Sequence, residues 1–143
     1  MIAPDTMVRC LAFMEAVWNG DAEAIESLAA SGAGEEPLGV LLAQYGDLVL
    51  QTLVTAQYGI NDDQPDDERE AAVERMRRDP GVQVSVVLAE TLKAWARTDV
   101  SVPAAAGIAR SVLSAILAFS EDATEDSVLP MLAKLREDAL RAS

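Results

Sequence analysis

Histidine is absent from this 143-residue sequence, and Cys10 is its only cysteine. Without histidine the chain cannot form a Ser-His-Asp or Cys-His catalytic set, nor a histidine-ligated zinc or iron site. A single cysteine excludes an intrachain disulfide and a cysteine-based zinc site, and it is typical of a reducing compartment. We therefore expect a cytoplasmic, non-enzymatic protein with no cofactor and no metal. Cys10 itself is expected to be buried and inert.

Basic residues are scarce in the first 68 positions, where Arg9 stands alone against 13 Asp and Glu, a net charge of −12. Residues 69–143 carry 11 acids and 10 bases, a net charge of −1, so the total of −13 lies almost wholly on the acidic half, residues 1–68. Such a field repels nucleic acid and anionic membranes and favours basic partners. We expect an acidic face that binds a basic protein and is formed by Glu23, Glu26, Glu35, Glu36, Asp62, Asp63, Asp66 and Asp67.

Aromatic residues make up only 4% of the chain, although 50% of it is hydrophobic. The core must therefore consist of Leu, Val, Ile, Met and Ala, the usual material of close-packed helices. A chain of this length corresponds to one domain with one core. The start, MIAPDTMVRC, lacks the pattern of a signal peptide. We predict an all-α fold, a compact single-domain bundle of about six or seven helices with short loops over residues 1–143.

Helix-capping and helix-breaking residues, together with the spacing of apolar residues, place the expected helices near residues 6–18, 21–29, 37–56, 65–78, 81–97, 103–119 and from 126 onward. The third is apolar on more than one side, which is typical of a central helix. It lies in a stretch long enough to span a bilayer, but Asp47 near the centre favours a buried helix of a soluble protein. The fourth begins with acids and ends with arginines, in accord with the helix macrodipole, and offers little apolar surface. It should lie on the outside.

Residues 82–88 are ambiguous because alternating valines form a strand pattern, whereas Val87, Leu88, Thr91, Leu92 and Trp95 follow helical spacing. A helix is favoured because no second run could pair with an isolated strand. In the last helix the expected apolar positions are Leu129, Leu132, Leu135 and Leu140.

Two stripes of small residues allow helix axes to approach closely, either within the chain or at a dimer seam. They are Gly39, Ala43 and Gly46 in the third helix and Gly107, Ser111 and Ala115 in the sixth. Homodimerisation is therefore a possibility that the sequence leaves open.

Two further functions remain as alternatives to the interaction module. The bundle could enclose a small apolar ligand, with Met14, Trp18, Tyr45 and Trp95 as pocket residues. A metal-dependent hydrolase could use paired carboxylates, Glu23 with Glu26 and Asp63 with Asp66. The segment FMEAVWNGDAEAIESLAA resembles the first helical hairpin of SnoaL-like proteins, but the rest of the chain lacks the strands of that fold, so no family is assigned.

Overall fold

In a computed structural model, which describes residues 2–30, 35–120 and 124–142, these ranges form seven α-helices and one short 3₁₀ helix. The elements are α1 (Pro4–Asn19), α2 (Ala22–Ala29), α3 (Leu38–Gln57), α4 (Asp66–Arg78), α5 (Pro80–Thr98), α6 (Val102–Phe119), η1 (Glu125–Ser127) and α7 (Val128–Arg141). No strand occurs in these described ranges, so the prediction of an all-α bundle is confirmed. Residues 82–88 are helical and belong to α5.

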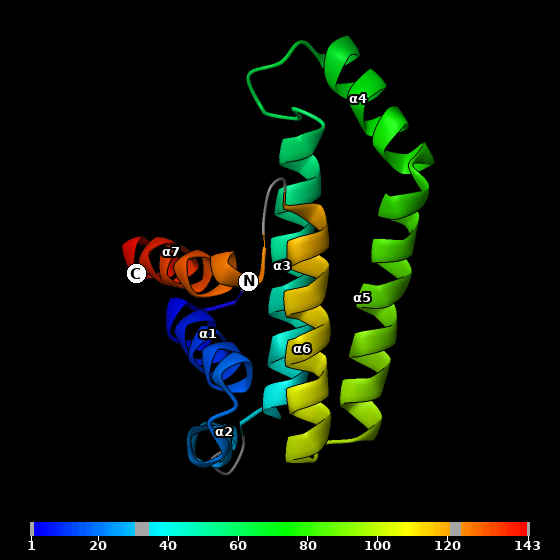
Figure 1. Cartoon of the computed structure of the whole chain (residues 1–143). Coiled ribbons are helices and arrows are strands. Elements are labelled where there is room, and N and C mark those ends of the chain that lie inside the picture. Colours follow the sequence, from blue (N-terminus) through cyan, green and yellow to red (C-terminus); the bar gives the residue numbers. More distant parts are fainter. Residues whose placement is uncertain (1, 31–34, 121–123, 143) are drawn as a thin grey trace.

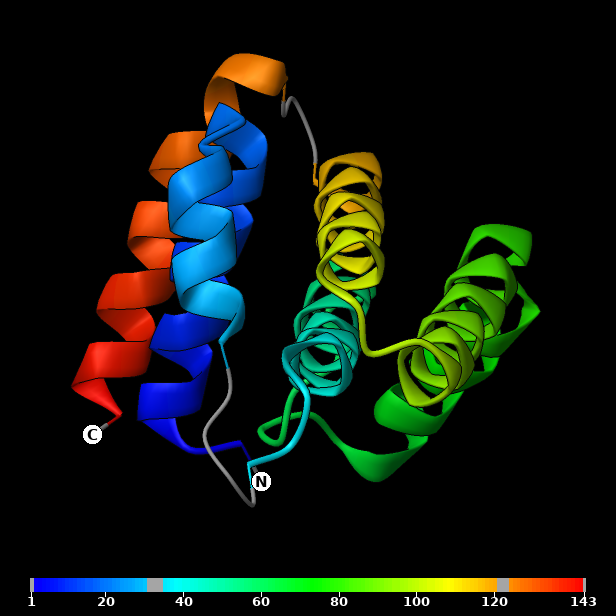
Figure 2. The ribbon, with the colours of Figure 1, turned by 90° about the horizontal axis from the view of Figure 1, so that it is seen from below.

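The helices form three layers around a central pair, α3 and α6 (Figure 1). Helices α1, α2 and α7 cover one side of this pair, and α5 covers the other (Figure 2). Because α3 packs against α1, α5 and α6, it buries residues around most of its circumference, as the sequence predicts. Helix α4 leaves the bundle at one end and continues beyond it (Figure 1).

The central pair approaches closely because α3 presents glycine to α6. A β-carbon at Gly46 would lie 2.6 Å from Val112 Cγ2, and one at Gly39 would lie 3.4 Å from Ile108 Cδ1. On α6, a β-carbon at Gly107 would lie 2.5 Å from Trp95 Cη2. These glycines of both small-residue stripes therefore pack within the chain rather than at a dimer seam.

The helix ends follow the expected punctuation. Asn19 ends α1, and Gly20 adopts a left-handed conformation with φ of +68°. The Asp21 carboxylate caps α2 by accepting a hydrogen bond of 3.1 Å from the Ala24 amide. Ser101 caps α6 in the same way through the Ala104 amide.

The predicted apolar positions of α7 are partly wrong, and the helical spacing in α5 does not coincide with its buried face. Helix α5 buries Val82, Ser85, Ala89, Leu92 and Ala96, whereas Val87 is exposed. Three of these five inward side chains are small, which lets α5 lie directly against α3 and α6. In α7, Leu129 and Leu140 are exposed, and the inward positions are Val128, Leu132 and Ala139.

Within the described residues, α3 and α6 are long and apolar enough to cross a membrane by length and composition, with mean hydropathy of 1.3 and 1.7. Half of each segment is buried inside the bundle. Their apolar character is therefore explained by the core that they build, which is consistent with a soluble protein.

Candidate functional site

The eight side chains of the predicted acidic face are all exposed, but they form two groups at opposite ends of α3. The group on α2 and just before α3 contains Glu23, Glu26, Glu35 and Glu36. The group after α3, in the α3–α4 loop and the first turn of α4, contains Asp62, Asp63, Asp66 and Asp67. Since α3 has 20 residues, its ends lie about 30 Å apart. The structure therefore does not bring them together into one face.

The same separation applies to the paired carboxylates of the hydrolase hypothesis. Glu23 and Glu26 lie near the start of α3, and Asp63 and Asp66 lie beyond its end, so the two pairs cannot share one metal ion. Nowhere in the described parts of the chain do three or more potential metal ligands form a group.

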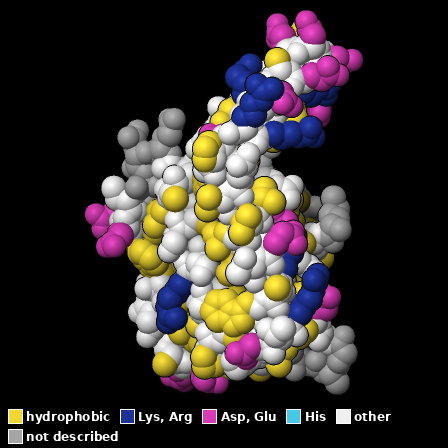
Figure 3. Space-filling model, turned by 90° about the vertical axis from the view of Figure 1, so that its right-hand side faces the viewer, with side chains coloured by type: hydrophobic (Ala, Val, Ile, Leu, Met, Phe, Trp, Pro, Cys, Tyr) yellow, Lys and Arg dark blue, Asp and Glu magenta, His cyan; other side chains and the backbone are white. Residues whose placement is uncertain are grey.

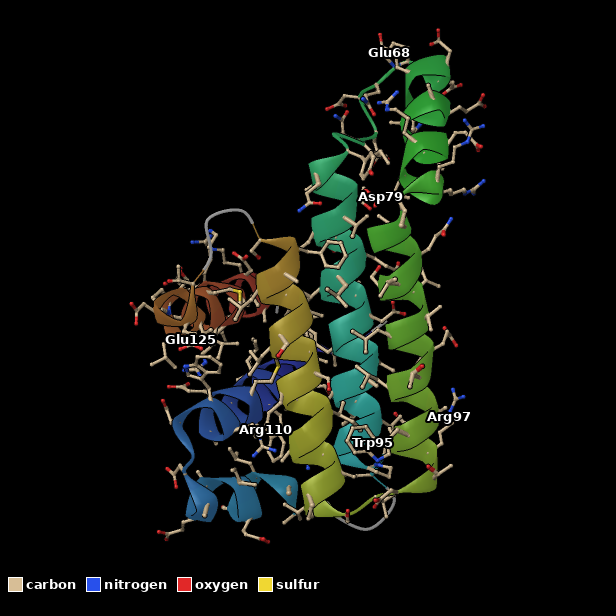
Figure 4. The ribbon with its side chains drawn as sticks, turned by 45° about the vertical axis from the view of Figure 1, so that its right-hand side comes forward. Glu68, Asp79, Trp95, Arg97, Arg110 and Glu125 are labelled. Carbon is tan, nitrogen blue, oxygen red and sulfur yellow. The ribbon has the colours of Figure 1, made fainter. Side chains whose placement is uncertain are left out.

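The second group belongs to a projecting structure. We call α4 the arm, and we call Asp62, Asp63, Asp66, Asp67 and Glu68 the acidic tip. Glu68 lies at the opposite end of the molecule from Trp95 and Arg97 (Figure 4). The Arg69 guanidinium is 2.5 Å from Asp66 Oδ1 and 3.9 Å from Asp62 Oδ1. Ala72 is the arm's buried residue, so the prediction that this helix lies on the outside is confirmed.

The junction of the arm with α5 is held by Tyr58 and Asp79, which the sequence analysis did not single out. The Tyr58 hydroxyl donates a hydrogen bond to Asp79 Oδ2, and Asp79 Oδ1 accepts one of 2.8 Å from the Gly81 amide. The Tyr58 hydrogen bond, followed by that of Gly81, lowers the pKa of Asp79 from its usual 3.8. The hydrogen bond to Asp79 also raises the pKa of Tyr58 above 10.0. Asp79 could have been identified from the sequence as a helix N-cap, because it directly precedes Pro80 and Asp is a preferred N-cap residue.

Tyr58→Phe should loosen the arm without unfolding the bundle, because it removes the side-chain hydrogen bond from the end of α3 to the arm–α5 junction. We expect faster amide hydrogen exchange in α4 and unchanged exchange in α6, measured by mass spectrometry. The contact should be present above pH 3.8 and lost as pH falls through the lowered pKa of Asp79. It should also be lost at high pH, once Tyr58 ionises above its raised pKa. Equal exchange of α4 in the wild type and the variant would contradict this role.

The only basic residue of the acidic half is engaged within the fold. The Arg9 guanidinium lies 3.4 Å from Glu35 Oε2 and donates to the carbonyl oxygens of Leu28 and Ala30. These contacts join α1 to the end of α2. Arg9 therefore neutralises part of the first acidic group and leaves the acidic tip unaffected.

The four predicted pocket residues do not converge. Met14 and Tyr45 are fully buried in the core, whereas Trp18 and Trp95 are each 37% exposed. Trp95 lies on α5 against Gly107, and α1, which carries Met14 and Trp18, lies on the other side of the central pair (Figure 2). The structure therefore does not bring Trp95 together with Met14 and Trp18.

An open groove of about 310 Å³ lies elsewhere, between α3, the end of the arm and α5. Its polar rim includes Asp47, which receives hydrogen bonds of 2.7 Å from Lys93 Nζ and 3.0 Å from Gln51 Nε2. Lys93 also lies 3.5 Å from Glu90. The apolar residues that line the groove are Leu50, Val54, Met76, Val82, Val86 and Ala89.

The outer surface of α5 carries three exposed valines. Val84, Val86 and Val87 are 66%, 58% and 65% exposed, and hydrophobic side chains run along this side of the molecule below the charged arm (Figure 3). Val84 and Val87 are three positions apart and share one outer side of α5, whereas Val86 points toward the groove.

Cys10 lies within the core and has no exposed surface. Burial raises the pKa of its thiol to about 12, so the nucleophilic thiolate does not form near neutral pH. The expectation that Cys10 is buried is confirmed.

Comparison with known proteins gives no relative on which to base a function. No family model, no curated protein and no solved structure matches this chain.

Proposed function

We propose that this protein is a non-enzymatic interaction module that binds a basic partner protein through the acidic tip. The supporting observation is the position of five carboxylates at the end of a projecting arm, with Arg69 as their neighbouring base. A one-signed charge at a projecting position increases the rate of encounter with an oppositely charged partner and selects against like-charged ones. We place this function in the cytoplasm, in accord with the single reduced cysteine.

Stabilisation of α4 explains only part of the negative charge at the acidic tip. Asp66, Asp67 and Glu68 occupy the first turn of α4, where each acid stabilises the helix by about 0.3–1 kcal/mol through the macrodipole. Asp62 and Asp63 precede the helix, outside that turn, and are exposed. Partner binding explains why the charge extends beyond what α4 needs.

The proposal is tested by comparing two triple variants that remove the same charge from opposite ends of α3. The tip variant is Asp62→Asn/Asp63→Asn/Asp67→Asn, and the matched control is Glu23→Gln/Glu26→Gln/Glu36→Gln. Each is used to retain partners from a lysate of the source organism at increasing salt. We expect a basic protein that the wild type and the control retain, that the tip variant loses, and that dissociates as salt screens the charges within about 8–10 Å.

Two results would contradict the proposal. One is retention of the same basic protein by the tip variant and the wild type alike. The other is the absence of any basic protein from the wild-type eluate at low salt, where exposed charges interact most strongly.

The groove between α3 and α5 favours a second candidate function, the binding of a small apolar ligand. Its volume of about 310 Å³ is at the lower end of the range of about 300–1,000 Å³ typical of ligand pockets, and its rim is open. A bound small molecule detected by native mass spectrometry, and displaced by Leu50→Trp, would support this candidate over the acidic tip.

A further inference from the structure

The groove between α3 and α5 adjoins the base of the acidic tip. Thr55 of α3 lines the groove, and its carbonyl oxygen accepts a hydrogen bond of 3.1 Å from the Ile60 amide. A second, more open hollow shares Gln51 and Thr55 with the groove and extends to Ile60. Asp62 follows Ile60 after one intervening residue, so at most about 7 Å of chain separates the two. The adjoining hollows therefore lead from the groove to the first carboxylates of the tip.

Negative charge also lies at the other end of the groove. Asp47 belongs to the α3 wall and Glu90 to the α5 wall. Lys93 Nζ lies 2.7 Å from Asp47 Oδ2 and 3.5 Å from Glu90 Oε1, so two carboxylates and one ammonium leave a net charge of −1 there. The Glu90 side chain is 70% exposed and can approach a partner. The groove is thus bounded by carboxylates at both ends.

The lining between these carboxylates is apolar. Six apolar side chains line the groove, of which Val86 is exposed at the edge and Met76 belongs to the arm. The arginines of the arm's last turn are not among the lining residues of the described chain. A helix with its side chains is about 10–12 Å across, so a groove of about 310 Å³ receives the side chains of one helix face rather than a whole helix.

We propose that the groove binds a basic amphipathic helix of the partner protein. The apolar face of that helix lies in the groove, with basic residues at both of its ends. One end meets Asp47 and Glu90, and the other meets Asp62 and Asp63 of the tip. This inference rests on the proposed function, since it states which kind of segment the basic partner presents.

The lining favours a helix over other peptide conformations. An extended peptide binds by adding to the edge of a sheet, and the described ranges of the chain contain no strand. A polyproline helix binds to grooves lined by aromatic rings, and no aromatic side chain is among the lining residues of the described chain. An amphipathic helix needs only an apolar groove for anchors at i, i+3 or i+4, and i+7.

The distance between the two charged ends sets the length of the bound helix. The part of α3 from Asp47 to Thr55 covers about 12 Å, and the chain from Ile60 to Asp62 adds at most about 7 Å. A helix of about 12–14 residues spans the resulting distance of roughly 20 Å. The charge of Asp62 and Asp63, which α4 does not need, then holds one end of the partner helix.

Two synthetic peptides test the groove by fluorescence anisotropy with the purified full chain. Both contain the same leucines and lysines in about 14 residues, but only one has its leucines on a single helix face. Because the two peptides carry equal charge, the acidic tip alone would bind them equally. We expect the amphipathic peptide to bind roughly tenfold or more tightly than its isomer. Equal affinity for the two peptides overturns the inference.

Val86 and Val87 provide a matched pair of variants. The two side chains are 58% and 65% exposed on the same helix, but of the two it is Val86 that lines the groove. Val86→Arg should abolish the preference for the amphipathic peptide, because it places a charge against the peptide's apolar face. Val87→Arg changes the net charge equally and should keep the preference. With circular dichroism showing both variants to be helical, an unchanged preference in Val86→Arg or an equal loss in Val87→Arg overturns the inference.

Glu90→Gln tests the charge at the end of the groove away from the tip. It should weaken the amphipathic peptide by roughly twofold to fivefold, as expected for the loss of one exposed ion pair. Glu70→Gln is the control, since Glu70 is an exposed acid of the arm outside the groove lining. Equal weakening by the two substitutions would overturn the placement of a basic residue beside Glu90.

The two proposals fail separately. If the tip variant Asp62→Asn/Asp63→Asn/Asp67→Asn weakens both peptides and the wild type binds them equally, the proposed function is supported and the groove is overturned. If the preference depends on Val86 while the tip variant binds as tightly as the wild type, the groove is supported and the proposed function is overturned. A small apolar molecule found in the groove by native mass spectrometry would overturn the helix as its occupant. So would a homodimer of the chain that Val86→Arg dissociates.

Discussion

Gly46→Leu should destabilise the protein by about 3 kcal/mol or more and lower its melting temperature by roughly 10 °C. A β-carbon at Gly46 would lie 2.6 Å from Val112 Cγ2 and 3.0 Å from Val112 Cγ1. Both Gly46 and Val112 are buried on the helices that form the central pair, so neither backbone can move without disturbing the core. Thermal unfolding followed by circular dichroism measures the effect.

Two alanine substitutions serve as matched controls for this prediction. Gly46→Ala should also be destabilising, because even a methyl group collides with Val112. Gly39→Ala should be neutral or slightly stabilising, since its methyl would lie 3.4 Å from Ile108 Cδ1 and alanine favours a helix by about 1 kcal/mol over glycine. Val112→Ala in the Gly46→Leu background should restore part of the stability. A wild-type melting temperature for Gly46→Leu would refute the close packing of α3 on α6.

Leu132→Ala should cost about 2–5 kcal/mol of unfolding free energy. Leu132 is 1% exposed and belongs to the core cluster that α7 shares with α1. Its truncation leaves a cavity that the surrounding helices can fill only partly, and the lost contacts are not replaced. Urea denaturation should show a lower midpoint with an unchanged slope.

Leu140 provides the control on the same helix. It is 56% exposed, so Leu140→Ala should change stability by no more than about 0.5 kcal/mol. The spacing of both leucines in the sequence predicts that they lie on the apolar face of α7. Equal destabilisation by the two substitutions would mean that this assignment was right and that the orientation of α7 in the bundle is wrong.

The arm is stable away from the core because its own charges stabilise the helix. Acids in its first turn and Arg75, Arg77 and Arg78 in its last turn act favourably with the macrodipole. A polar helix of this kind can project from a bundle because its own charge pairs stabilise it.

The sequence was most informative where local physics decides the structure. The sequence correctly predicted the end of α1 at Asn19-Gly20, the N-cap Asp21, and the order of acids and arginines along α4. Capping and macrodipole effects depend only on neighbours along the chain. Central placement of α3 also followed from its composition, since a helix apolar most of the way round must be covered on several sides.

The candidate sites were predicted less well, because they depend on which distant segments meet. Tyr58 and Asp79 are 21 positions apart in sequence, and no local pattern indicates that they form a hydrogen bond. Helical spacing also did not show which side of α5 is buried: Ser85, Ala89 and Ala96 lie inward beside Val82 and Leu92, whereas Val84, Val86 and Val87 stay exposed.

The sequence by itself thus determined the all-α class, the approximate limits of the helices, the lack of histidine chemistry and the concentration of negative charge in residues 1–68. Only the tertiary structure decided that this charge divides between the two ends of α3, that the arm projects and that Val84, Val86 and Val87 of α5 stay outside. The physical reason is that periodicity and capping act within a few residues. Charge distribution in space and the choice of buried face depend instead on how whole helices pack against one another.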